Sequence, residues 1–100
     1  MAAQTIYRLK YPVALQFRQG DGEIREESIT EIKLRRPTAK ELRLVDSFGG
    51  RMVGMMIAMI SALSGEEETT IERIDAEDFG ELAELIEGFL PDGQKTGETS

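Results

Sequence analysis

The side chains that could do chemistry in this sequence are mostly carboxylates. Histidine and cysteine are absent, which excludes the commonest general base and metal ligand as well as any thiol nucleophile. Asp75 and Asp78 are three residues apart, but they are better explained as residues of a helix start than as an acid–base pair. Residues 20–22 and 48–50 lack the spacing or the lysine of a phosphate-binding loop, and residues 66–68 lack the alternating ligands of a calcium loop. The sequence therefore predicts no enzyme, no cofactor and no metal site.

Charge is divided unequally along the chain, whose 100 residues carry a net charge of −7. Residues 1–51 hold ten Lys/Arg and seven Asp/Glu, a net charge of +3, whereas residues 52–100 hold two Lys/Arg and twelve Asp/Glu, a net charge of −10. This balance argues against nucleic-acid binding, although Arg35 and Arg36 keep phosphate contact open as an alternative. The longest uncharged stretch, residues 52–65, is too short to span a membrane, and the first residues do not resemble a secretory signal. We therefore expect a soluble intracellular protein.

The first third of the chain has the pattern of a β-hairpin. Apolar and polar residues alternate across residues 9–17, which predicts a half-buried strand, and Pro12 requires that this strand has a free edge. Residues 21–22, Asp-Gly, predict the turn. The second strand, residues 24–34, changes its alternation near residues 27–28, where we expect a bulge or a division into two short strands. The first-strand residues expected on one face are Leu9, Tyr11, Val13, Leu15 and Phe17.

Three helices are predicted after the hairpin, over residues 38–47, 51–64 and 75–89, with a short turn at residues 70–74. Thr38 and Glu41 have the spacing of a capping box, and Asp75 has the character of an N-cap. The predicted fold class is α+β, an N-terminal antiparallel hairpin followed by a small bundle of three helices. We expect a single domain over residues 1–90. Residues 91–100 contain no apolar anchor and are predicted to be a disordered tail.

The second predicted helix carries no charge and has one methionine-rich face. Methionine is flexible and polarisable, so such a face suits a surface that binds a partner. Two other interpretations stay open, because the same residues could fill the core or form the seam of a homo-oligomer. Gly54, on another side of this helix, predicts a close approach by a second helix. The candidate partner-binding residues are Met52, Met55, Met56, Met59 and Leu63.

Several segments, in chain order, resemble the tail assembly chaperones of Mu-like and P2-like tailed bacteriophages. Residues 32–42, IKLRRPTAKEL, resemble the family signature LRRPT-A-x-[DE]-L. Residues 60–65, ISALSG, followed by residues 71–79, IERIDAEDF, are similar to the family segment L-sG…l-x-x-L-D-a-x-D-[FY]. Residues 86–90, IEGFL, are similar to the closing v-x-G-F-L. The resemblance covers about residues 13–90.

The resemblance implies a non-enzymatic role in building long tails. The chain would bind the tape measure protein, a long and largely helical chain, and keep it soluble before the tail tube assembles around it. The resemblance also implies action in the cytoplasm of the bacterial host, absence from the mature virion, and a longer form made by ribosomal frameshifting. The alternative is a self-assembling structural or adaptor protein of the tail region without chaperone activity. Neither role involves nucleic acid or a membrane.

Overall fold

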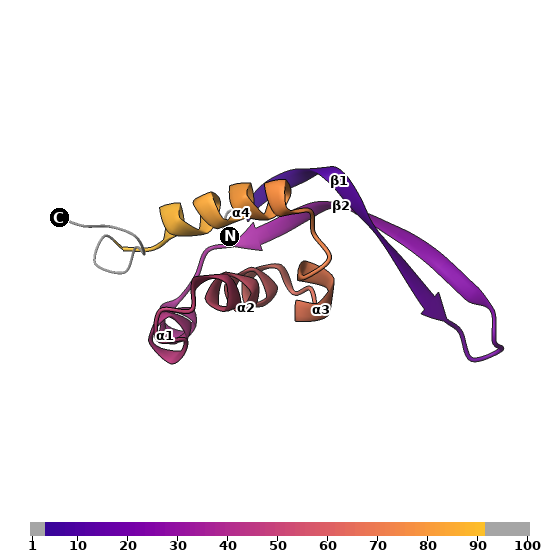
Figure 1. Cartoon of the computed structure of the whole chain (residues 1–100), viewed down its shortest axis with the longest axis horizontal. Helices are drawn as coiled ribbons and strands as arrows, with labels where there is room; N and C mark the ends of the chain where they lie inside the picture. The colour runs from indigo at the N-terminus through magenta and orange to yellow at the C-terminus, as the bar shows by residue number, and fades with distance from the viewer. Residues whose placement is uncertain (1–3, 92–100) are drawn as a thin grey trace.

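The computed structural model describes residues 4–91 and shows two strands followed by helices (Figure 1). The elements are β1 (Gln4–Arg18), β2 (Ile24–Arg35), α1 (Ala39–Ser47), α2 (Met52–Ser64), α3 (Glu68–Ile71) and α4 (Ala76–Phe89). The predicted α+β class, an N-terminal antiparallel hairpin followed by three longer helices, is confirmed. The short helix α3 stands where the sequence predicted a turn, and it begins two residues earlier. Of the tail predicted at residues 91–100, all but Pro91 lies outside the described residues.

A kink in β1 divides the hairpin into two paired parts. Residues 4–8 pair with residues 31–35, and residues 13–18 pair with residues 24–29, both antiparallel. The four residues 9–12 of β1 therefore lie opposite a single residue of β2. Such an excess on one strand disrupts the ladder locally and bends the sheet.

The position of this irregularity differs from the prediction. Both alternatives expected at residues 27–28, a bulge and a division into two short strands, were wrong, because β2 is one strand that pairs regularly there and the extra residues belong to β1. Pro12 has no amide hydrogen to donate, and the amides of Lys10 and Tyr11 donate to Asp78 of α4 instead of to β2. The strand can leave the ladder here because these two amides find another acceptor.

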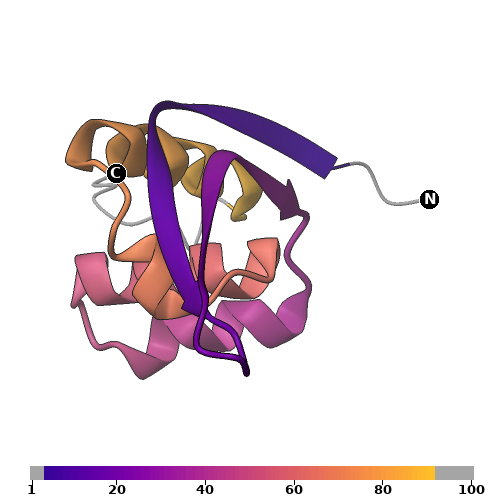
Figure 2. The ribbon, with the colours of Figure 1, turned by 90° about the vertical axis from the view of Figure 1, so that its right-hand side faces the viewer.

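The kink carries the outer half of the hairpin beyond the helices. This half runs past α3 in Figure 1, and its turn points toward the viewer in Figure 2. Leu9 and Val13 are buried as predicted, and Leu15 is half-buried. Tyr11 and Phe17 are exposed, contrary to the prediction. Alternation is interrupted at Tyr11, which lies within the kink. Phe17 stays on the face of Val13 and Leu15, but the helices cover this face only in part there.

One hydrophobic core joins the hairpin to the helices. Helix α2 lies at its centre and contacts β2, α1, α3 and α4, while α4 also packs against β1. Removal of these apolar side chains from water is the main favourable contribution to folding. The buried members are Leu9, Val13, Ile32, Leu34, Met55, Met56, Met59, Ile60, Leu63, Ile71, Ile74, Leu82, Ile86 and Leu90.

The helix starts are fixed by the side chains that the sequence predicted. The Glu41 carboxylate accepts a hydrogen bond from the Thr38 amide at 2.7 Å, within the capping box of α1. The Asp75 carboxylate accepts one from the Glu77 amide at 2.9 Å and caps α4. Gly65 ends α2 in the left-handed conformation, with φ of 81°. These local signals explain why the predicted helix boundaries are close to the observed ones.

Candidate functional site

Two glycines shape the corner between α1 and α2. Gly49 and Gly50 have φ values of 53° and 90°, which glycine adopts without a steric cost. The turn brings the ring of Phe48 against α2, where a Cβ added to Gly54 would lie 3.3 Å from two ring carbons. The close approach predicted at Gly54 was that of a second helix, but the structure places the aromatic ring of Phe48, directly after α1, at this position.

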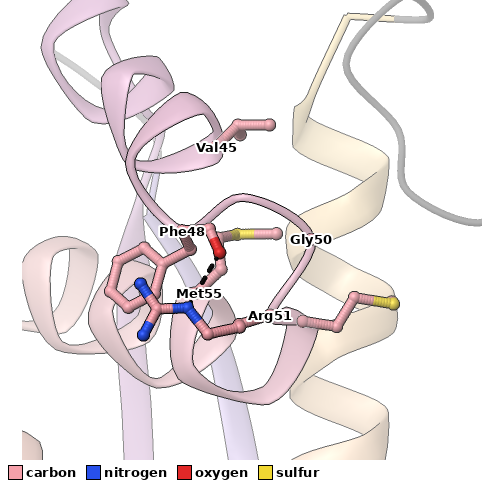
Figure 3. A pocket seen from close by; sticks show the side chains of 6 residues that line it. Val45, Phe48, Gly50, Arg51 and Met55 are labelled. Carbon is pink, nitrogen blue, oxygen red and sulfur yellow. Dashed lines mark hydrogen bonds between the residues drawn. The ribbon is translucent and has the colours of Figure 1, made fainter.

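Arg51 covers the same ring from outside (Figure 3). Its guanidinium carbon lies 5.4 Å from the centroid of the Phe48 ring, and its Nε donates to the Phe48 carbonyl at 3.0 Å. The cation–π contact and the hydrogen bond together hold Arg51 across the corner. An open hollow of about 210 Å³ lies beside it. The hollow is lined by Val45, Phe48, Gly50, Arg51, Met52 and Met55.

The first turn of α2 presents apolar side chains to water. Met52 is 43% exposed and Val53 is 63% exposed. Met52 lines the first hollow, and Val53 lines a second hollow of about 210 Å³ that includes Ile57 and Phe79. We call Met52 and Val53, together with these two hollows, the α2 patch. Exposed apolar surface of this kind marks sites where proteins bind other chains.

Four of the five predicted partner-binding residues lie in the core. Met55, Met56, Met59 and Leu63 are at most 3% exposed, and Met52 alone is at the surface. Of the interpretations of the methionine-rich face, the one in which its residues fill the core therefore describes where these four side chains lie. Contact of this face with a partner stays a prediction.

Val53 was missed by the sequence analysis, although it is more exposed than Met52. The sequence feature that could have indicated this exposure is the Gly49–Gly50 break directly before α2. The first turn of a helix that follows a sharp corner has neighbours on fewer sides than the later turns. Apolar residues placed there by the sequence are therefore candidates for exposure.

Asp78 connects the last helix to the first strand. Its Oδ1 accepts hydrogen bonds from the Tyr7 hydroxyl at 2.7 Å and the Lys10 amide at 3.0 Å, and its Oδ2 accepts one from the Tyr11 amide at 3.0 Å. The side chain is fully buried. Burial alone would raise the pKa of Asp78, but the hydrogen bonds from Tyr7 and the two amides hold this pKa below its ordinary value. The sequence assigned Asp78 only to the helix start and missed this connection.

Glu41 is a second buried carboxylate, and it connects the end of β2 to α1. The Arg35 guanidinium donates to both of its oxygens, at 3.1 and 2.9 Å, and also to the Ala62 carbonyl of α2 at 3.3 Å. The hydrogen bonds from Arg35 and from the Thr38 amide lower the pKa of Glu41 to about 2. Arg35, which the sequence left open as a phosphate contact, is thus engaged in holding three elements together.

The carboxylates of residues 4–91 show no arrangement typical of a metal centre. Within residues 4–91, no group of three or more carboxylate, histidine or cysteine side chains is placed to hold a metal ion. Asp75 caps the start of α4, whereas Asp78 accepts hydrogen bonds from the kink of β1. No helix in this described part of the chain is long and apolar enough to cross a membrane.

These features define the chain as a small α+β protein. It has a long hairpin, two buried carboxylates that connect its elements, and an open apolar patch. The family described as phage tail assembly chaperone proteins, E, or 41 or 14, matches residues 7–91, which is 85 of the 100 residues. The chain therefore belongs to this phage tail assembly chaperone family, and the resemblance found in its sequence is confirmed. No curated protein and no solved structure matches the chain.

The segments that carry the resemblance hold the fold together. In the first, Leu34 is buried and Arg35 pairs with Glu41. In the second, Asp75 caps α4 and Asp78 holds the kink of β1. The family itself suggests a non-enzymatic role in tail assembly with a tail-related protein partner. One of these segments, residues 71–79, also lines the second hollow of the α2 patch.

Proposed function

We propose that this chain binds the tape measure protein of a tailed phage or prophage and keeps it soluble until the tail tube assembles. Membership of the tail assembly chaperone family carries the proposal, and the α2 patch supports it with an exposed apolar surface. In this proposal the chain acts without catalysis in the cytoplasm of the bacterial host and is absent from the mature virion. It works there beside a longer, frameshifted form of itself.

The α2 patch suits an apolar stripe on a helical partner. Recognition of an amphipathic helix requires apolar contacts and hollows that receive its side chains. Met52 and Val53 border different hollows, so a partner can place apolar side chains at two positions around the first turn of α2. The flexible Met52 side chain adapts to anchors of different shape. The net charge of −7 opposes aggregation of the resulting complex.

Replacing Met52 and Val53 together by aspartate is expected to weaken binding of the tape measure protein at least about tenfold, because two apolar contacts are lost and charge is introduced. Both side chains are exposed, so the variant should fold normally. The measurement is co-expression with the tape measure protein of the same phage, followed by the soluble fraction after centrifugation and by pull-down. We expect the soluble tape measure protein to fall to the level found without this chain.

The matched control is Ile6→Asp, because Ile6 is 56% exposed and lies near the start of β1, outside the α2 patch. This variant should solubilise the partner as the wild type does. Substitution of Met59 would be uninformative, because a charge at this fully buried position would unfold the core. Normal solubilisation by the double variant would show that the patch is not the binding site. A wild-type chain that only associates with itself and leaves the tape measure protein insoluble would favour the self-assembling adaptor instead.

A further inference from the structure

The outer half of the hairpin, residues 13–18 and 24–29, forms an arm that extends beyond the helices (Figure 1). Side chains alternate between the two faces along a strand, so Val13, Leu15 and Phe17 share one face of the arm. Val13 is buried, Leu15 is half-buried and Phe17 is 46% exposed. The apolar row that begins in the core therefore continues along the arm into water.

An open groove of about 280 Å³ lies between this face and the turn from α2 to α3. Leu15 and Phe17 form one wall, and the charged residues of the opposite wall are Glu66, Glu67 and Arg73. Arg25 is the strand partner of Phe17, so it lies on the same face of the arm as the groove. The groove thus combines apolar surface with a basic residue on the arm and with two acidic residues and one basic residue on the opposite wall.

The other face of the arm also carries apolar surface near the turn. Ile24 is 59% exposed and is the strand partner of Arg18. A two-stranded hairpin that stands alone is marginally stable in water. An arm with apolar side chains on both faces is stabilised when another chain covers it.

We propose that the arm docks on a second copy of this chain, with Phe17 of each copy in the groove of the other. Charge complementarity selects this occupant, because in a twofold arrangement Arg25 of each arm meets Glu66 and Glu67 of the other copy. Arg25 also pairs with Glu27 of its own strand, which keeps its guanidinium on this face. A basic helix in the groove would be repelled by Arg25, and an acidic one by the two glutamates. The groove shares no lining residue with the α2 patch, and the inference does not rest on the proposed function.

The first test measures association of the purified full chain alone, by sedimentation equilibrium over a wide range of concentrations. We expect a dimer that dissociates on dilution. Phe17→Asp should raise its dissociation constant at least about tenfold, because an aromatic anchor is lost. Ile6→Asp, at a comparably exposed apolar residue of β1, should leave the dissociation constant unchanged. A chain that stays monomeric at all concentrations, or a Phe17→Asp variant that associates like the wild type, would overturn the proposal.

A charge exchange identifies the occupant of the groove and remains informative if Phe17→Asp does not fold. Arg25→Glu alone and Glu67→Arg alone should each weaken self-association several-fold, because like charges then meet. An equimolar mixture of the two variants should recover a heterodimer, because opposite charges meet again in both halves of the interface. A mixture that associates no better than either variant alone overturns the arrangement. The arrangement is also overturned if these variants keep self-association and lose only capture of the tape measure protein. Such a result would place a helix of the tape measure protein in the groove.

Discussion

Asp78→Asn is expected to lower the free energy of unfolding by about 3–5 kcal/mol. Both oxygens of Asp78 accept hydrogen bonds, from Tyr7 and Lys10 at one oxygen and from Tyr11 at the other. Asparagine replaces one of these oxygens by an NH₂ group, so a buried donor then faces a donor whichever way the amide is turned. Urea unfolding followed by circular dichroism at pH 7 measures the effect.

Asp75→Asn is the matched control, because it is the same substitution three residues earlier in the chain. Asp75 caps α4, and asparagine caps a helix about as well as aspartate, so the free energy of unfolding should change by well under about 1 kcal/mol. Tyr7→Phe removes one of the three donors and should give an intermediate loss. If Asp78→Asn were no more destabilising than Asp75→Asn, the buried carboxylate would not be holding the kink.

The wild-type free energy of unfolding is expected to fall steeply as the pH drops from about 5 to about 2. Folding lowers the pKa of Glu41 from its ordinary value of 4.5 to about 2, chiefly through the Arg35 guanidinium. A carboxyl group whose pKa is lowered by folding stabilises the protein above its ordinary pKa, and this stabilisation is lost as the pH falls toward the folded value. The shift corresponds to about 3 kcal/mol at pH 7. Asp78, whose pKa is also lowered, acts in the same direction.

Glu41→Gln tests this assignment through the shape of the pH dependence. The variant should be less stable than the wild type at pH 7, and the difference should close toward pH 2, where the wild-type carboxylate becomes protonated. Glu84→Gln, at an exposed position of α4, controls for the loss of one carboxylate. The measurement is the urea unfolding free energy at several pH values from 7 to 2. A difference between Glu41→Gln and wild type that stays constant with pH would contradict the prediction.

The hairpin and the helix starts were predictable because their signals are local. The capping box of Thr38 and Glu41 and the cap at Asp75 act within four residues, and the structure shows both. The kink of β1 was not predictable in the same way. It depends on amides of Lys10 and Tyr11 that find their acceptor in Asp78, at a separation of 68 and 67 residues. Alternation along one strand carries no information about such an acceptor.

The candidate site was predicted only in part. The sequence marked α2 correctly as a helix without charge, but a helix that is apolar all round does not reveal which of its sides the rest of the fold covers. The hairpin and the other helices cover Met55, Met56, Met59 and Leu63. The Gly49–Gly50 corner leaves the first turn open, so Met52 remains exposed and Val53 joins it.

The hydrogen bonds of Asp78 also set an order of events during synthesis. They join β1, which leaves the ribosome before the other described elements, to α4, which is made last among the described helices. At bacterial and eukaryotic elongation rates of about 5–20 residues per second, the amides of the kink remain without their acceptor for on the order of several seconds. Throughout this interval the core that buries Leu9 and Val13 lacks α4. The nascent chain is therefore exposed to the same aggregation hazard from which it is proposed to protect another protein.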